Sequence, residues 1–295
     1  MSVYYIEDLA YKLRCDVVKI LTKVGSGHLG GCLSSADIIA TLYGGGFLTK
    51  EEIKGRSVYP FVLSVGHLAP LLYAALARMG EFPLKELWTL RQLGSRLQGH
   101  PSIGHGHDHE ATPGLFCGSG SLGQGLSIAA GMAVARPETR VYALLGDGEL
   151  QEGQIWEAAM FAAHESLENL VAIVDVNGQQ LDGPTWDVMD LLDLAAKWKA
   201  FGWEVCKVDG HSCKALAKAI GNRGKVSKPK VILAKTRMGC GIPAIEDQSS
   251  WHGKAPSREQ EHDFLTALGI SYTTMWNRGN LEPLAADLTV NLEAL

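Results

Sequence analysis

The stretch LLGDGELQEGQIWEAAMFAAHESLENLVAIVDVNGQQLDG, from Leu144 to Gly183, decides the predicted fold. An apolar strand ends in Gly-Asp-Gly (146–148), a segment with helical spacing follows, and a second apolar strand leads into Asp-Val-Asn-Gly (175–178). Strand–helix–strand units of this kind make right-handed crossovers, so the two strands are expected to be parallel, with their carboxyl ends at one edge of a sheet. Open parallel sheets bind their ligands at that edge.

The rest of the chain continues the alternation of helices and short buried strands. Hydrophobic spacing predicts helices over 3–23, 35–43, 68–80, 121–135, 153–167, 190–201 and 213–221, and strands over 61–67, 141–145, 170–174, 203–210 and 229–236. The intervening segment 81–119 looks irregular and polar. This order predicts an α/β protein with three α/β/α layers and a mostly parallel sheet.

Composition excludes several classes of protein. The chain has 295 residues, 46% of them hydrophobic and 20% charged, as in ordinary globular proteins. Its formal net charge of −5 argues against nucleic acid as a partner. The sequence shows no signal peptide and no membrane span. Six scattered cysteines without a C-x-x-C pair indicate reduced thiols, so we expect a cytoplasmic location.

Asp147 and Asn177 are candidate ligands for one divalent ion. Carboxylate and amide oxygens are hard ligands suited to Mg²⁺ or Ca²⁺. The 28 residues between Gly148 and Asn177 are enough for one helix and one strand, so both side chains can reach the same sheet edge. The alternative is two ordinary turns, because Gly, Asp and Asn are common turn formers. An Asn after a second buried strand favours the ion site.

Gly-Asp-Gly followed about 28 residues later by Asn resembles the thiamine diphosphate motif. The segments GDGELQEGQIWEAA, SGSLGQGLS, FVLSVGH, GSGH, QGHP and WHGKAP are similar to transketolases in particular, and they occur in the family's order. The resemblance runs from about residue 8 to residue 256. It implies the thiamine diphosphate-binding fold, with a diphosphate-binding domain over residues 1–256. Residues 257–295 would form a tail that is helical or contacts a partner.

The resemblance also implies roles for individual residues. Mg²⁺ (or Ca²⁺) would be bound by the side chains of Asp147 and Asn177 and the main-chain carbonyl of Gln179. The cofactor itself would be bound by His67, Gly120, Ser121, Leu122, Gly146, Gly148, Glu152, Asn177, His252 and Lys254. Glu152 also matches a carboxylate at the family's subunit interface. The catalytic histidines would be His28, His67, His100 and His252.

Histidines suit this chemistry because imidazole can accept and donate protons near pH 7. Six of the ten histidines directly follow a glycine, which places them on turns with little neighbouring bulk. The remaining candidates fall outside the family's motifs, and we expect His164, His211 and His262 to be structural. His105, His107 and His109 alternate in GHGHDHE, which is compatible with either a transition-metal site or a polar loop.

The largest departure from the family is the absence of its pyrimidine-binding half. In transketolases that half carries the glutamate that activates the cofactor and the arginines that select a sugar phosphate. We therefore expect a split enzyme, with the pyrimidine domain on a separate C-terminal subunit and an α2β2 assembly. The expected activity is transfer of a two-carbon ketol unit from a ketose (phosphate) donor to an aldose.

Two alternatives stay open at this point. A related thiamine diphosphate enzyme could deliver a two-carbon unit from a ketose or 2-oxo acid to another acceptor, such as an acyl carrier, a lipoyl group or a biosynthetic intermediate. A degenerate subunit could regulate or scaffold a partner without catalysis.

Overall fold

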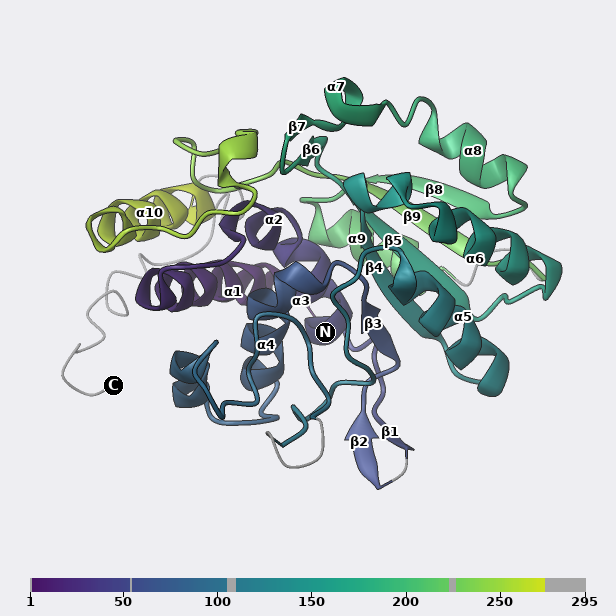
Figure 1. The fold of residues 1–295 in the computed structure, drawn as a ribbon, viewed down its shortest axis with the longest axis horizontal. Coiled ribbons are helices and arrows are strands. Elements are labelled where there is room, and N and C mark those ends of the chain that lie inside the picture. Colours follow the sequence, from purple (N-terminus) through teal and green to yellow (C-terminus); the bar gives the residue numbers. More distant parts are fainter. Residues whose placement is uncertain (1, 54, 105–109, 223–226, 274–295) are drawn as a thin grey trace.

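The computed structural model describes residues 2–53, 55–104, 110–222 and 227–273. Its centre is a parallel sheet of five strands in the order β3-β4-β5-β9-β8 (Figure 1). These strands are β3 (Phe61–Leu63), β4 (Val141–Gly146), β5 (Leu170–Val176), β8 (Glu204–Asp209) and β9 (Lys230–Lys235). The predicted α/β class and the parallel sheet are confirmed. Two short antiparallel pairs lie outside it, β1 (Glu51–Ile53) with β2 (Arg56–Val58) and β6 (Gln179–Gln180) with β7 (Gly183–Pro184).

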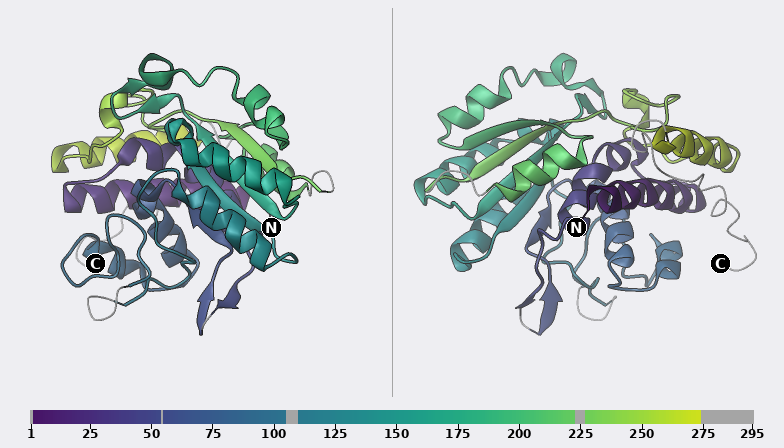
Figure 2. Two further views of the ribbon diagram at one scale, coloured as in Figure 1. Left: turned by 45° about the vertical axis from the view of Figure 1, so that its right-hand side comes forward. Right: turned by 180° about the vertical axis from the view of Figure 1, so that it is seen from behind.

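Helices cover both faces of the sheet, which makes three layers (Figures 1 and 2). Alternate strand side chains enter separate cores: Tyr142 and Leu144 of β4 point into one, and Ala143 and Leu145 into the other. The first core contains residues of α1 (Val3–Val24), α2 (Leu29–Ser34), α3 (Ala36–Gly44), α4 (Ala69–Arg78), α9 (Cys213–Gly221) and α10 (Arg258–Ser271). The second contains residues of α5 (Gln124–Ala135), α6 (Gly153–His164) and α8 (Leu194–Ala200).

The predicted helix over 121–135 begins later, at Gln124. Gly123 has a φ of +86°, a left-handed conformation that glycine adopts at little cost. This turn aims the Gly123 N–H at the Glu149 carboxylate, at 2.8 Å. Residues 121–123 are therefore kept out of the helix by a contact to the end of β4.

Two further predictions of element length were wrong. The strand predicted over 61–67 ends at Leu63, because the chain turns into a short 3₁₀ helix at Gly66–Leu68. The helix predicted over 190–201 begins only at Leu194, as α8, after Leu192 with a φ of +52°; a separate short helix, α7 (Thr185–Met189), ends before the predicted range. The irregular segment 81–119 also contains a 3₁₀ helix, Leu84–Thr89.

Within the C-terminal tail, α10 lies beside α1. A capping box of Ser257 and Gln260 starts this helix, and Phe264 and Leu268 are buried. Tyr272 then stacks on Tyr11 of α1 with ring centroids 4.5 Å apart. The prediction for residues 274–295 lies outside the described residues, as does the one for His105, His107 and His109. In the described part of the chain, no helix combines the length and apolarity that crossing a membrane requires.

Candidate active site

The carboxyl ends of β4 and β5 meet at one edge of the sheet. Gly146 pairs with Asp175 in parallel register, so Asp147 and Asn177 each follow a neighbouring strand end. The Asp147 carboxylate bridges the two ends, because its Oδ2 accepts a hydrogen bond from the Gly178 backbone at 2.6 Å. The predicted juxtaposition of these two strand ends is therefore present in the structure.

A cavity of about 210 Å³ opens at this edge. Its lining includes many of the predicted binding residues, namely His67, Leu122, Gly146, Asp147, Gly148, Glu152, Asn177, Gln179 and His252. Other predicted residues do not line it in the described part of the chain: His28, His100, Gly120, Ser121 and Lys254.

The chemistry of Asp147 fits a divalent ion. Burial, followed by the charge of the nearby Asp175 carboxylate, raises the pKa of Asp147 to about 7. Hydrogen bonds from the backbone N–H groups of Gly178 and Gly148 lower this pKa, but by less than the other two effects raise it. A cation at this point would offset both effects. No cluster of three or more His, Cys, Asp and Glu side chains suited to a metal occurs among the described residues. An ion here would therefore depend on amide and carbonyl oxygens as well, which suits Mg²⁺ or Ca²⁺.

Asn177 and Gln179 complete this group of oxygen donors. Asn177 is 9% exposed, and its Oδ1 accepts a hydrogen bond from the Gln179 backbone at 2.9 Å. This contact holds the turn after β5 close to the carboxylate of Asp147.

The glycines beside Asp147 are packed so closely that a side chain at either position would crowd its neighbours. A Cβ at Gly146 would lie 3.0 Å from Cγ1 of Val65, and one at Gly148 would lie 3.2 Å from Cβ of Gln180. Bare backbone thus lines this side of the cavity, as an anionic phosphate group requires for close approach.

Three predicted histidines form a cluster, and two of them, His67 and His252, line the same cavity. The ring centroids of His28 and His67 are 4.9 Å apart, those of His67 and His252 are 5.3 Å apart, and those of His28 and His252 are 5.9 Å apart. His28 therefore adjoins the cavity through rings that line it.

Their surroundings keep these imidazoles neutral at pH 7. Burial, with the other histidines, lowers the pKa of His67 to about 3. Burial, then His252, Arg91 and His100, lower the pKa of His28 to about 4. Burial also lowers the pKa of His252. The Nδ1 atoms of His28 and His252 are buried and make no hydrogen bond with the described residues.

His100 lies beside the turn that carries Gly120. A Cβ on Gly120 would lie 3.5 Å from the His100 ring, and burial followed by the charge of Arg91 lowers the pKa of His100. Arg91 donates to Oγ of Ser26 at 3.1 Å, so it links the segment before His28 to the segment before His100. The sequence offered no specific signal for Arg91.

The remaining predicted residues lie at the margin of the site. Glu152 is exposed at the rim of the cavity, and Ser121 is exposed outside it. Lys254 is exposed, and its Nζ lies 4.5 Å above the Trp251 ring.

Glu149 is a site residue that sequence reasoning missed. It is buried at 2% exposure, bonds the Ser64 hydroxyl, and accepts hydrogen bonds from the backbone of Gly123 and of Gly146 at 2.8 and 3.2 Å. It therefore ties the ends of β3 and β4 to the start of α5. Its place directly after Gly-Asp-Gly was the available signal.

Comparison with known proteins agrees with this arrangement. The family model for the transketolase thiamine diphosphate-binding domain matches residues 6–277. A transketolase from Pongo abelii is 43% identical over 257 residues, which are 84% of this chain and 40% of that protein. The 6-deoxy-6-sulfo-D-fructose transketolase subunit SqwG of Clostridium sp. (strain MSTE9) is 39% identical over 261 residues, which are 83% of this chain and 91% of that one.

Solved structures give the same assignment. Transketolase from Pichia stipitis in complex with sedoheptulose 7-phosphate superposes with a TM-score of 0.79 at 30% identity, over 91% of this chain and 41% of that one. The chain thus spans about 40% of the length of such transketolases. It belongs to the transketolase family, of which it contains the thiamine diphosphate-binding domain.

Proposed function

We propose that this chain is the diphosphate-binding subunit of a split transketolase. With a separate C-terminal subunit that carries the pyrimidine domain, it would move a two-carbon ketol unit from a ketose (phosphate) to an aldose. The observation that carries the proposal is the cavity in which Asp147 and Asn177 face a cluster of neutral histidines. Residues 1–256 would be the cofactor-binding domain and 257–295 a tail.

The division into subunits is supported by a relative of similar extent. The Clostridium protein is called a subunit, and the match covers 91% of it. Exposed apolar side chains occur in the segment that flanks the cavity: Leu181 is 66% exposed and Trp186 is 57% exposed. A partner subunit would cover such side chains. By analogy with the family we propose an α2β2 assembly, in which Glu152 at the rim would contact another chain.

Bound thiamine diphosphate would supply the carbon nucleophile and electron sink of the reaction. Asp147, Asn177 and the carbonyl of Gln179 would hold Mg²⁺ or Ca²⁺, and with it the diphosphate against Gly146 and Gly148. The further cofactor contacts would come from the predicted residues His67, Gly120, Ser121, Leu122, Glu152, His252 and Lys254.

The histidines would handle the substrate's protons. Burial lowers the pKa of both His28 and His252, which favours neutral rings that would accept a proton from a sugar hydroxyl. His100 would approach the sugar from the side of Gly120. A reducing compartment such as the cytoplasm is proposed as well, because all six cysteines are free thiols.

The test is a reconstitution of the full chain with a pyrimidine-domain subunit. Donors would include ketose phosphates and the sulfo sugar named for the Clostridium relative, with aldoses and aldose phosphates as acceptors. We expect ketol transfer that is lost in Asp147→Ala, since the ion would lose its carboxylate. The control is His164→Ala, whose imidazole is 84% exposed on α6, away from the cavity.

Three outcomes would contradict the proposal. Transfer from pyruvate but from no ketose would favour the alternative acceptor chemistry. Unchanged activity in Asp147→Ala would remove the ion site. Failure to bind thiamine diphosphate and Mg²⁺ even with the partner subunit would favour a non-catalytic role.

A further inference from the structure

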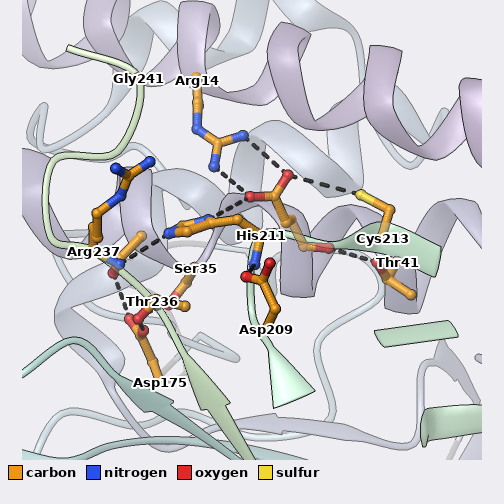
Figure 3. A network of polar contacts seen from close by, with 12 residues as sticks. Arg14, Ser35, Thr41, Asp175, Asp209, His211, Cys213, Thr236, Arg237 and Gly241 are labelled. Carbon is orange, nitrogen blue, oxygen red and sulfur yellow. Dashed lines mark hydrogen bonds and ion pairs between the residues drawn. The ribbon is translucent and has the colours of Figure 1, made fainter. Parts of the chain in front are cut away.

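Asp175 is a buried carboxylate at the end of β5 to which the proposed function assigns no task. It is 2% exposed and lines the cavity beside Asn177. Figure 3 shows Asp175 beside Thr236 and Ser35: its Oδ1 accepts from the hydroxyl of Thr236, and its Oδ2 lies 2.7 Å from the hydroxyl of Ser35. The same Oδ2 lies 2.5 Å from the hydroxyl of Ser34. Both oxygens are therefore engaged by neutral hydroxyl groups of the protein.

The same Oδ2 also accepts a hydrogen bond from the side-chain amide of Asn177. Nδ2 of Asn177 lies 3.3 Å from Asp175 Oδ2 and 3.4 Å from Ser34 Oγ. An ionised carboxylate only accepts hydrogen bonds, so it can face the NH₂ group of the amide but not its oxygen. A flipped amide would place two unpaired acceptors against each other in a buried site, which is costly.

We propose that Asp175 is a positioning residue that fixes the Asn177 amide with Oδ1, the ion-binding atom, turned toward the site. This inference rests on the proposed function, since it assumes the divalent ion. Direct binding of the ion by Asp175 is disfavoured, because its two oxygens already have four protein partners.

The donors that hold Asp175 come from rigid elements. Ser35 directly precedes α3, and Thr236 follows β9. The next residue, Arg237, donates its backbone N–H to Nε2 of His211 at 2.9 Å, and Nδ1 of His211 lies 2.9 Å from Oδ2 of Asp37. Because Nε2 accepts, the ring proton is on Nδ1 and points at Asp37.

Arg14 of α1 completes this network of hydrogen bonds. Its guanidinium donates to both oxygens of Asp37, at 2.6 and 3.3 Å. The carboxylate of Asp175 is thus held by partners that are themselves locked by packing and hydrogen bonds, as a precise ligand orientation requires. His211, expected to be structural, is part of this support.

The inference is tested with Mn²⁺, followed by electron paramagnetic resonance in the full chain reconstituted with a pyrimidine-domain subunit and excess thiamine diphosphate. Asp175→Asn can present an NH₂ group to Asn177, which leaves the Gln179 backbone N–H on Oδ1 as the remaining contact that orients the amide. We expect Mn²⁺ affinity to fall about 10–100-fold, the usual loss when a partner that orients a metal ligand is replaced. The control Thr41→Val removes a buried hydroxyl that bonds the backbone of Asp37, and it should keep the wild-type affinity.

Repeating Asp175→Asn in an Asn177→Asp protein shows whether Asp175 acts by orienting the Asn177 amide or only by its negative charge. In Asn177→Asp the two oxygens of the introduced carboxylate are equivalent, so no orientation is needed. There, Asp175→Asn should leave Mn²⁺ affinity unchanged or improve it, because the amide introduced at position 175 can donate a hydrogen bond to the carboxylate introduced at position 177. A loss by the same factor in both backgrounds would mean that Asp175 acts only through its charge, and would overturn the inference.

Other outcomes are equally distinct. Wild-type protein that binds neither Mn²⁺ nor the cofactor would refute the proposed function itself. Wild-type binding with an unchanged Asp175→Asn would refute only the role of Asp175. If circular dichroism shows that Asp175→Asn is unfolded, Ser34→Ala replaces it. That variant removes the second acceptor of the Asn177 amide, and we expect an affinity loss of about 3-fold or more; no loss would refute the inference.

Discussion

The buried imidazole of His67 should make the protein sensitive to mild acid. Its pKa is lowered from 6.5 to about 3, because burial and the neighbouring histidines disfavour the charged ring. The unfolded chain therefore takes up the proton first. Stability from this residue is fully present above about pH 6.5 and is lost as the pH falls toward the folded pKa.

The size of the effect follows from the two pKa values. At pH 5 the unfolded ring is almost fully protonated and the folded ring is not. The difference of 1.5 pH units below the reference pKa of 6.5 corresponds to about 2 kcal/mol. Because the ring retains partial solvent contact, screening reduces this value. We expect His67 to account for a loss of about 1–2 kcal/mol between pH 7.5 and pH 5.

The assay compares wild type with His67→Gln, which cannot be protonated. Urea unfolding is followed by circular dichroism at both pH values, without cofactor or divalent ions. Asp147 acts with the opposite sign, since its pKa is raised to about 7, so the difference between the two proteins isolates His67. His262→Gln, at an exposed position of α10, should keep the wild-type pH dependence. An identical pH dependence in wild type and His67→Gln would refute the reasoning.

Three further predictions concern the surroundings of the site. Asp37→Ala should cost about 3–5 kcal/mol in urea unfolding, because it leaves the Arg14 guanidinium and the His211 ring buried without their carboxylate, and Arg14→Met/Asp37→Leu should recover the part that is due to Arg14. Arg91→Met removes a charge that lowers the pKa of His28, so the acid limb of the kcat/KM profile should move to higher pH; an unmoved limb would contradict that coupling. Glu149→Gln turns an NH₂ group toward a backbone donor and should cost about 1–3 kcal/mol in urea unfolding, whereas wild-type stability would show that the acceptor is dispensable.

The parts of the site that could be predicted are those written in short local patterns. Asp147 and Asn177 each follow a buried strand, and the rule for parallel crossovers is enough to bring them to one sheet edge. The resemblance then supplied the histidines, and the structure places His28, His67 and His252 in one cluster.

The parts that were missed depend on contacts between distant segments. Asp175 meets Ser34 and Ser35 across about 140 residues of sequence, and Glu149 meets Ser64 across 85. No local spacing encodes such pairs. The late start of α5 has the same origin, since Gly123 turns out of the helix to reach Glu149.

Burial acts in opposite directions at the two ends of the cavity, and this difference organises the site. At the oxygen end it raises the pKa of Asp147 to about 7, so the carboxylate is poorly stabilised without a cation. At the imidazole end it lowers the pKa of His67 to about 3, so the ring stays a proton acceptor. A divalent ion beside Asp147 would favour the ionised carboxylate and, by its charge, the neutral imidazoles as well. One desolvated cavity can therefore attract a cation at one end and keep bases unprotonated at the other.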